Sequence, residues 1–391
     1  MTTDFASLGF TDNEVQTELR ALARKFAENE IRPIVDRDEE TETFRPEIIR
    51  KLGQVGLTGV PVPEAYGGAG LGYAEYLVVI EELARVSASY AVSVSVTGLA
   101  QMILASGGTE DQKAKYLPKL ASGEMIGGFA LSEASSGSDA ASLRLTARFV
   151  AGSAGQDGDH YVLNGTKLWI TQADSAGVLI VMARTGGPGA SGVTAFAVET
   201  NSPGFRCSKR EKKMGLSISH TMEIVLENVR VPAENRIGPE GEGFKVAMNA
   251  LNGGRLTISA VAVGVGRGAL EVAVAHAKER EQFGKKIAEF QGVSFLLADM
   301  RATLDASELL LRRAAALRDA GLPFATEASI SKLFTTDATM KVTTDAVQIL
   351  GGSGYTKEFP AERYMREAKI LQIFEGTNQI QRMIIGRALT K

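Results

Sequence analysis

The chain has 391 residues, of which 44% are hydrophobic and 23% charged, and its formal net charge is -3. This composition is typical of a globular protein with a core large enough for two or three domains, and it lacks the basic surface that nucleic-acid binding needs. The single cysteine, Cys207, excludes a disulfide within the chain, and three separated histidines without ligand spacing argue against a metal site.

The N-terminal segment, MTTDFASLGFTDNEVQTELR, is polar and acidic, with neither an apolar signal core nor an Arg-rich presequence. We therefore expect no secretion or organelle signal and predict a cytoplasmic location. We also expect no membrane insertion, since we expect no uncharged apolar run to approach the ~18 to 20 residues of a membrane helix.

The first third of the chain has helical periodicity. Thr11 and Glu14 have the spacing of a capping box, and apolar residues recur at helical intervals from Val15 to Phe26. Further helical patterns follow on both sides of a Pro- and Gly-rich loop, GVPVPEAYGGAGLGYAEY. We assign residues 1–125 to an N-terminal all-α domain.

From about Ile126 the pattern changes to short apolar strands separated by Gly, Ser and Pro. Asn164-Gly165, within HYVLNGTKLWITQ, is a strong hairpin signal. The segment Gly187–Gly192 formally matches GxGxxG, but strand candidates on both sides favour a hairpin loop over a nucleotide-binding motif. We assign residues 126–238 to a middle domain, a small β-barrel or sandwich.

From about Gly243 helical periodicity returns and continues to the end of the chain. The segment from Phe244 to Gly284 is rich in Ala and Val and apolar on more than one face, which is typical of a helix buried in a bundle or at a subunit interface. We assign residues 239–391 to a C-terminal four-helix-bundle domain. The predicted fold class is therefore α+β, with three domains in the order α, β, α.

Several polar residues are candidates for a site, and each has a structural alternative. Glu375, in QIFEGTNQIQR, is either a charge tolerated near a helix that Thr377 caps or a base kept for a reaction. Arg255 is either a buried cation or part of an exposed turn after Gly253-Gly254. The segment FALSEASSGSDAAS could bring backbone N–H groups to a ligand, although its composition alone favours a plain loop.

Taken singly, Trp169 is typical of a strand core, Arg280 of a solvated helix end, and QILGGSGY of a helix stop. Taken together and in this order, the segments resemble the acyl-CoA dehydrogenase family over essentially the whole chain. ALSEASSGSD is similar to the family's flavin loop, QILGGSGYTKEFPAERYMREAK to its C-terminal signature, and FEGTNQIQR to the segment with its base.

The resemblance implies an enzyme that binds FAD and oxidises the Cα–Cβ bond of an acyl-CoA thioester to a trans-2-enoyl-CoA. It implies that Glu375 removes the α-proton and that flavin N5 accepts the β-hydrogen as hydride, which no side chain could do. Burial beside the flavin and the acyl chain would raise the pKa of the base and so match it to this task. In the family, the N–H of the base residue and a ribityl hydroxyl hold the thioester oxygen.

The resemblance also implies the residues of the site. Positions that match FAD contacts of the family are Phe129, Leu131, Ser132, Ser138, Trp169, Ile170, Thr171, Phe283, Thr377, Asn378 and Gln379. Positions that match contacts to the FAD of a neighbouring subunit are Arg280, Gln291, Gln348, Ile349, Leu350, Gly351 and Gly352. Positions that match substrate contacts are Ser138, Asn252, Gly253, Gly254, Arg255 and Gly376. We therefore expect a homotetramer built as a dimer of dimers, with electron-transfer flavoprotein as electron acceptor.

The chain departs from the family pattern at a few positions. Phe374 stands where many relatives carry Tyr, and Asn252 where many carry Asp. Some branches place the base near position 254, which here is Gly254. Relatives that take dicarboxylic acyl groups use an Arg near the pocket floor, whereas Ser89–Ala100 contains no cation. We therefore favour an uncharged acyl chain, short or branched, from fatty acid or amino acid catabolism.

Two other functions are considered. An acyl-CoA oxidase on the same scaffold would pass electrons to dioxygen, and slow reoxidation in air of an anaerobically bleached flavin would count against it. A helical binding or scaffolding protein without catalysis would purify colourless, but the intact Glu375, Ser138 and Arg280 argue against this function.

Overall fold

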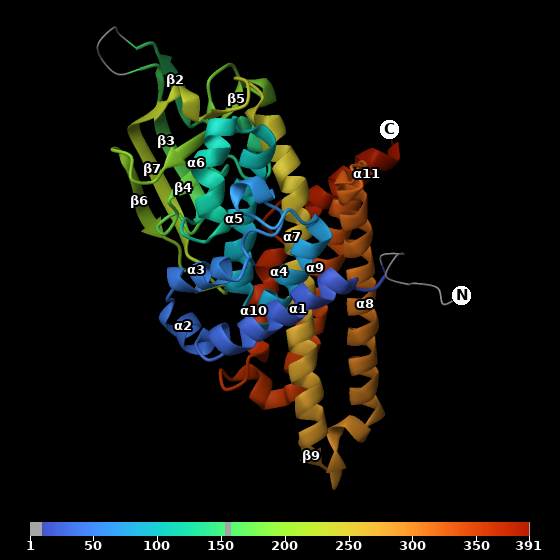
Figure 1. Cartoon of the computed structure of the whole chain (residues 1–391). Coiled ribbons are helices and arrows are strands. Elements are labelled where there is room, and N and C mark those ends of the chain that lie inside the picture. Colours follow the sequence, from blue (N-terminus) through green and yellow to red (C-terminus); the bar gives the residue numbers. More distant parts are fainter. Residues whose placement is uncertain (1–9, 153–157, 391) are drawn as a thin grey trace.

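The computed structural model describes residues 10–152 and 158–390 and has three groups of elements in chain order. Figure 1 shows the N-terminal helices and the sheet on one side of the long C-terminal helices. The order is α, β, α, so the predicted fold class is confirmed.

The N-terminal region is helical, and two of its helices, α4 and α5, are buried over most of their length. Helix α1 begins with a capping box in which the Gln16 N–H donates to Asn13 Oδ1 at 2.8 Å and the Asn13 N–H donates to Gln16 Oε1 at 3.2 Å. The predicted box of Thr11 and Glu14 is therefore wrong by two residues, because Asn and Gln serve in the same roles. The helices are α1 (Glu14–Phe26), α2 (Val35–Thr41), α3 (Pro46–Gln54), α4 (Tyr73–Val86), α5 (Ala88–Gly107) and α6 (Glu110–Ala121).

The middle region is one eight-stranded sheet. Its strands follow the order β6-β7-β3-β2-β4-β5-β8, and β1 pairs with β4 in parallel. Strands β4 and β5 pair antiparallel, so Gly187–Gly192 lies in the hairpin loop that the sequence predicted. The strands are β1 (Gly127–Ala130), β2 (Thr146–Val150), β3 (His160–Thr171), β4 (Val178–Arg184), β5 (Val193–Glu199), β6 (Phe205–Arg210), β7 (Thr221–Pro232) and β8 (Arg236–Ile237).

The hairpin predicted at Asn164-Gly165 is wrong, because β3 runs through these residues without turning. The pairing of β3 with β7 shifts register between Leu163 and Gly165, and Gly165 has φ +145°. Opposite the shift, the Asn228 N–H donates to Asn164 Oδ1 at 2.8 Å. The Asn-Gly pair therefore forms a bulge within a long strand, which uses the same backbone freedom as a turn.

The C-terminal region is built from long helices. Helices α7 to α10 pack into the predicted four-helix bundle, and α11 packs on α9. A short hairpin of β9 (Glu281–Gln282) and β10 (Lys285–Lys286) joins α7 to α8 at the far tip of the bundle (Figure 1). The helices are α7 (Gly243–Glu279), α8 (Gln291–Asp319), α9 (Ala325–Leu350), α10 (Ala361–Leu371) and α11 (Asn378–Thr390).

Helix α7 approaches α4 closely because two glycines face it. A β-carbon on Gly264 would lie 2.2 Å from the Glu81 carbonyl oxygen, and one on Gly268 would lie 2.5 Å from the Arg85 carbonyl oxygen. Both distances are shorter than van der Waals contact, so only glycine allows the two backbones to pack at this separation. This contact fixes the N-terminal helices against the bundle.

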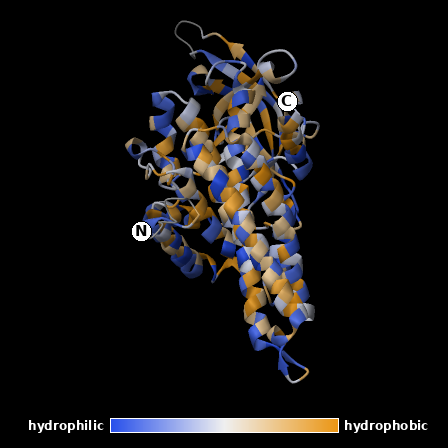
Figure 2. Cartoon of the chain, turned by 90° about the vertical axis from the view of Figure 1, so that its right-hand side faces the viewer, coloured by the Kyte–Doolittle hydropathy of each residue, from blue (hydrophilic) through white to orange (hydrophobic). Residues whose placement is uncertain are grey.

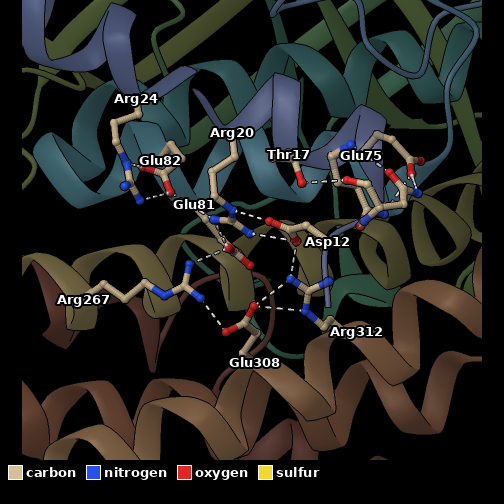
Figure 3. A network of polar contacts seen from close by, with 12 residues as sticks. Asp12, Thr17, Arg20, Arg24, Glu75, Glu81, Glu82, Arg267, Glu308 and Arg312 are labelled. Atoms are coloured by element: carbon tan, nitrogen blue, oxygen red, sulfur yellow. Dashed lines mark hydrogen bonds and ion pairs between the residues drawn. The ribbon is translucent and has the colours of Figure 1, made fainter. Parts of the chain in front are cut away.

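A network of partly buried ion pairs joins the same parts (Figure 3). Asp12, just before α1, pairs with Arg20 of α1 at 2.5 Å and with Arg312 of α8. Arg20 also pairs with Glu81 of α4 at 3.0 Å, and Arg267 of α7 pairs with Glu81 at 2.9 Å. Residues of four helices, α1, α4, α7 and α8, are thereby joined to one another.

Two helices are long and apolar enough to match a membrane span by length and composition alone. They are α5, whose most apolar 18 residues have a mean hydropathy of 1.4 and are 83% buried, and α7, for which these values are 1.6 and 67%. The expectation that no such run exists is therefore wrong, but burial inside the protein accounts for both helices. Figure 2 shows hydrophobic residues spread along the long bundle helices, whereas the tip beyond them is mostly hydrophilic.

Candidate active site

The segment between α10 and α11 is a strained turn that carries Glu375. Glu375 has φ +53° and Gly376 has φ +88°, in the left-handed region that is unfavourable for a residue with a β-carbon. Thr377 caps α11, because its hydroxyl accepts a hydrogen bond from the Ile380 N–H at 3.3 Å. The helix start that the sequence suggested is therefore real, and Thr377 caps it as predicted.

One oxygen of the Glu375 carboxylate, Oε2, is buried without a partner among the described residues. The residue as a whole keeps some accessible surface. A β-carbon on Gly254 of α7 would lie 2.6 Å from Oε2 and 3.6 Å from Leu99 Cδ1 of α5. Burial raises the pKa of Glu375 to about 7, even though Arg255 and Lys332 act to lower it.

Arg255 is buried on α7, which decides between the two alternatives that the sequence left open. Its Nη1 donates to Asn252 Oδ1 at 2.6 Å, while Nε has no partner among the residues described. The neighbouring Gly253 carbonyl accepts from the Tyr73 hydroxyl at 2.8 Å. All four residues predicted to contact substrate here, Asn252 to Arg255, are within α7 and not in a turn before it.

A cavity of about 460 Å³ lies beside this part of α7. Tyr73, Met102, Gly253 and Arg318 are among the residues that line it. The Arg318 guanidinium lies 3.5 Å from the centre of the Tyr73 ring, and its Nη2 is 3.2 Å from Met102 Sδ. The volume is in the range of small-molecule sites.

The loop after β1 contains the predicted flavin-loop residues. Ser138 is exposed at its tip, whereas Leu131 is buried, and both Phe129 and Ser132 are partly accessible. The backbone of the loop is attached to β3 where the Leu168 N–H donates to the Ser132 carbonyl at 2.9 Å.

A buried ion pair between Lys167 and Glu133 attaches this loop to β3. Lys167 of β3 donates to the Leu131 carbonyl at 3.0 Å and to Glu133 Oε1 at 2.8 Å. Glu133 in turn accepts from the Arg144 and Leu145 N–H groups at 2.6 and 2.9 Å. Sequence reasoning missed both residues, although a lysine on the inward-facing side of an alternating strand was a usable signal.

Trp169 does not lie in the core as a single strand tryptophan usually does. Its side chain is 54% exposed, and its φ is +60°. The pairing of β3 with β7 shifts register between Lys167 and Ile170, so the strand bulges at this point. Such a bulge re-aims a side chain. Trp169 is thereby turned outward, while Ile170 stays buried and Thr171 is partly accessible.

Helix α5 connects the loop and the carboxylate. Thr97 donates to the Gly127 carbonyl of β1 at 3.3 Å, and Leu99, two residues later, lies beside Gly254 and Glu375. Helix α5 thus contacts both β1, which leads into the loop, and the part of α7 that packs against the Glu375 carboxylate. An indole face and backbone groups of a loop suit a planar aromatic cofactor, so the residues present fit a flavin.

A second group of predicted residues lies at the opposite end of the bundle. At a rise of about 1.5 Å per residue, Gln348 is roughly 24 Å along α9 from Lys332, which contacts the Glu375 turn. By the same rise, Arg280 at the end of α7 is roughly 37 Å from Arg255. The rings of His276 and Phe359, 5.8 Å apart, place the end of α7 beside the segment that follows Gly351–Tyr355.

One chain therefore does not bring this second group to the Glu375 turn. Phe283 is 93% exposed, Gly351 and Gly352 are exposed, and Ile349 and Leu350 have buried side chains. The group at the far end is Arg280, Phe283, Gln291, Gln348, Ile349, Leu350, Gly351 and Gly352.

Asn378 and Gln379 follow the turn and differ in their surroundings. Gln379 is exposed, whereas Asn378 is buried and its amide bonds only within the protein. Its partners are Lys332, Thr336 and Asp337 of α9, at 2.7 to 2.9 Å. Sequence reasoning missed these supporting residues, because the contact joins positions far apart in the chain.

Models of the acyl-CoA dehydrogenase N-terminal, middle and C-terminal domains match residues 13–124, 128–229 and 241–390. An acyl-CoA dehydrogenase of Bacillus subtilis (strain 168) is 46% identical over 376 residues, which cover 96% of this chain and 97% of the relative.

Two solved structures are similar over nearly the whole chain. Butyryl-CoA dehydrogenase from Megasphaera elsdenii has a TM-score of 0.94 and 41% identity, covering 97% of this chain and 99% of that one. A chain in a structure described as the electron transferring flavoprotein of Acidaminococcus fermentans has a TM-score of 0.94 and 42% identity, covering 98% and 99%.

Proposed function

Because the chain belongs to the acyl-CoA dehydrogenase family, whose members are oxidoreductases acting on CH–CH donors, we propose that it converts an uncharged acyl-CoA to the trans-2-enoyl-CoA. The observation that carries this proposal is the Glu375 carboxylate, which is buried, unpartnered at Oε2 and held by a left-handed turn. A base of this kind suits removal of a weakly acidic α-proton, because its raised pKa lies near neutrality.

In the proposed reaction Glu375 accepts the α-proton of the thioester at its carboxylate. Exclusion of water around Oε2 makes the carboxylate a stronger base. It also keeps solvent from protonating the carboxylate before the substrate does. The Arg255 charge acts on the carboxylate, and Arg255 Nη1 donates to Asn252 Oδ1. We propose that this turn of α7, Asn252, Gly253, Gly254 and Arg255, contacts the substrate together with Gly376 and Ser138. When bound, FAD supplies the acceptor for the β-hydrogen as a hydride.

We propose that FAD is held by the loop after β1, the bulge of β3 and the start of α11. Trp169 offers its indole face, while Phe129, Leu131, Ser132 and Ser138 offer backbone and hydroxyl groups. Ile170, Thr171, Thr377 and Gln379 complete this set. For Asn378 we propose an indirect role, because its amide is engaged by α9.

The residues at the far end of the bundle support a proposal of oligomerisation. They are too remote to reach the Glu375 turn of the same chain, and Phe283 is almost fully exposed. We propose that Arg280, Phe283, Gln291 and Gln348–Gly352 contact the FAD of a second copy, in a homotetramer built as a dimer of dimers. An electron-transfer flavoprotein is the proposed electron acceptor, which the similarity to a chain in the A. fermentans structure supports.

The acyl chain is proposed to be short and uncharged. Helix α5 contributes no charged residue between Ser89 and Ala100, and most side chains there are small. The similarity to butyryl-CoA dehydrogenase from M. elsdenii supports the short-chain assignment.

Two other expectations stay predictions. They are the domain boundaries after residues 125 and 238 and the cytoplasmic location.

The test is anaerobic titration of the purified protein with butyryl-CoA, followed by absorbance of the flavin. The wild type is expected to bleach, whereas Glu375→Gln should remain yellow and folded with almost no reduction. Glu18→Gln, at an exposed position on α1, is the matched control. Substantial bleaching by Glu375→Gln would refute the proposal.

An acyl-CoA oxidase is the alternative function on this scaffold. Admission of air to the bleached protein separates the two, because an oxidase reoxidises its flavin rapidly and forms hydrogen peroxide. A dehydrogenase is expected to reoxidise slowly in air and quickly with an added electron-transfer flavoprotein.

A further inference from the structure

Lys332 is a lysine with no exposed surface in the protein interior. From α9 its ammonium donates to the Gly376 carbonyl and to Asn378 Oδ1, both at 2.9 Å. Both acceptors are neutral oxygens, so these hydrogen bonds do not neutralise the charge. Burial of an ammonium without a bonded carboxylate is unfavourable, and its presence beside the Glu375 turn calls for an explanation.

The turn is held from two sides at its carbonyl groups. The Gly376 carbonyl accepts from Lys332 and also from Gln381 Nε2, at 2.8 Å. The Glu375 carbonyl accepts from the same Gln381 nitrogen at 3.2 Å. Because a trans peptide is planar, carbonyls that point toward these donors direct the N–H groups of Gly376 and Thr377 away from them. Lys332 and Gln381 thus fix the orientation of a turn that is strained.

Lys332 is itself fixed by its neighbours. Asn378 accepts from Lys332 at Oδ1 and donates through Nδ2 to Thr336 at 2.9 Å and to Asp337 at 2.7 Å. Asp337 is also paired with Arg382 of α11 at 2.9 Å. The lysine therefore has one defined position and not a choice of partners.

The charges that face Glu375 come from several elements. Arg255 on α7 and Lys332 on α9 both act on its carboxylate, while their own hydrogen bonds go to Asn252, Gly376 and Asn378. Asp337 on α9 acts on Lys332, and Tyr73 on α4 faces Glu375 as a neutral phenol whose pKa burial raises. Burial lowers the pKa of Lys332 to about 7, so the ammonium persists on the acid side of neutrality. There its charge favours the carboxylate over the carboxylic acid.

We propose that Lys332 is a positioning residue for Glu375. Its hydrogen bond to the Gly376 carbonyl keeps the strained turn in the arrangement that places the carboxylate against Gly254. Its charge keeps that carboxylate ionised and able to accept a proton. This inference rests on the proposed function, in which Glu375 is the base.

Two variants of the holoenzyme separate the two effects. Lys332→Gln keeps a hydrogen-bond donor without the charge, whereas Lys332→Met has a similar length and lacks both. Loss of the charge should move the acid limb of the kcat/KM profile upward by roughly one pH unit in both variants. Loss of the donor should lower the plateau kcat only in Lys332→Met, by roughly 10- to 100-fold with little change in KM.

The matched control is Lys341→Gln on the same helix. Lys341 is 64% exposed and pairs with Asp345 at 2.5 Å, so its replacement should leave the pH profile and kcat unchanged. A pH limb that stays in place in both Lys332 variants would overturn the proposal. Lys332→Gln keeps the test available if Lys332→Met does not fold.

A second readout does not depend on turnover. The difference in stability between wild type and Glu375→Gln grows as pH rises from the unfolded pKa of Glu375 and levels off above its folded pKa. In the Lys332→Gln background the pH at which the difference levels off should rise by roughly one unit. An unshifted upper limit would overturn the role of Lys332 alone, whereas normal turnover by Glu375→Gln would overturn the proposed function.

Discussion

Glu375 Oε2 lies against Gly254, only 2.6 Å from where a β-carbon on that residue would stand. Helix α7 is therefore without a side chain at the one position where the carboxylate packs against it. Because the Glu375 backbone has φ +53°, the turn has little freedom to move the side chain elsewhere.

Gly254→Ala should displace the Glu375 carboxylate while leaving a folded protein. We expect flavin reduction by butyryl-CoA to slow on the order of 100-fold, since misplacement of a base by about 1 Å has this effect. Stopped-flow absorbance under anaerobic conditions measures the rate. Gly386→Ala on α11 is the control, because its β-carbon would meet no atom within 4 Å. Equal rates for the two variants would contradict the contact.

The acid limb of kcat/KM should lie near pH 7. The pKa of Glu375 is raised by burial to about 7, and only the carboxylate accepts the α-proton. Activity should therefore fall about tenfold for each unit below that pH. Initial rates between pH 5.5 and about 8.5 with a saturating electron acceptor measure the limb. A limb near the ordinary carboxyl range would show that Glu375 is solvated in the free enzyme.

Removal of the Glu375 charge should stabilise the protein at high pH. The folded pKa is about 7 against an ordinary value of 4.5, so the folded state binds the proton more tightly. The contribution of Glu375 to the stability of the wild type is then fully present below pH 4.5 and is lost as pH rises to 7, whereas Glu375→Gln lacks this loss. The advantage of Glu375→Gln should therefore grow by up to about 3 kcal/mol between pH 5 and pH 8. Urea unfolding at the two pH values measures it, and a constant difference would contradict the burial.

Asp12 should stabilise the joint between α1, α4, α7 and α8 (Figure 3). Burial acts to raise the pKa of Asp12. The hydrogen bonds and charges of Arg20 and Arg312 together outweigh this effect and lower the pKa from 3.8 to about 2. This stability is present above pH 3.8 and is lost as pH falls toward 2. Asp12→Asn should therefore cost about 2 kcal/mol at neutral pH and little near pH 2.

Chemical denaturation of Asp12→Asn, with exposed Glu14→Gln as its control, checks this expectation. The same penalty at both pH values would mean that shape and not charge holds the joint.

Trp169 should report occupation of the cofactor site. It is the only tryptophan in the sequence, and it is 54% exposed. Addition of FAD to the apoprotein should quench its emission and shift it to shorter wavelength, because a stacked flavin excludes water and accepts the excitation. Trp169→Phe identifies the signal as its own. FAD binding without a change in emission would place the flavin elsewhere.

Local pattern was sufficient for much of the architecture. The α, β, α order, the C-terminal bundle and the hairpin loop at Gly187–Gly192 were predicted from periodicity and turn residues, and the family and enzyme class from motifs in order. The hairpin at Asn164-Gly165 failed because an Asn-Gly pair also suits a bulge, and only the pairing with β7 decides between the two.

The sequence by itself identified Glu375 as a candidate base, because an ionisable glutamate between an apolar run and a glycine can be recognised from its neighbours in the chain. Only the tertiary structure decided its environment. Gly254, Arg255 and Lys332 reach Glu375 from helices far away in the chain, and burial by those helices sets its pKa. Desolvation and charge depend on distance in space, which a residue's neighbours in the chain do not specify.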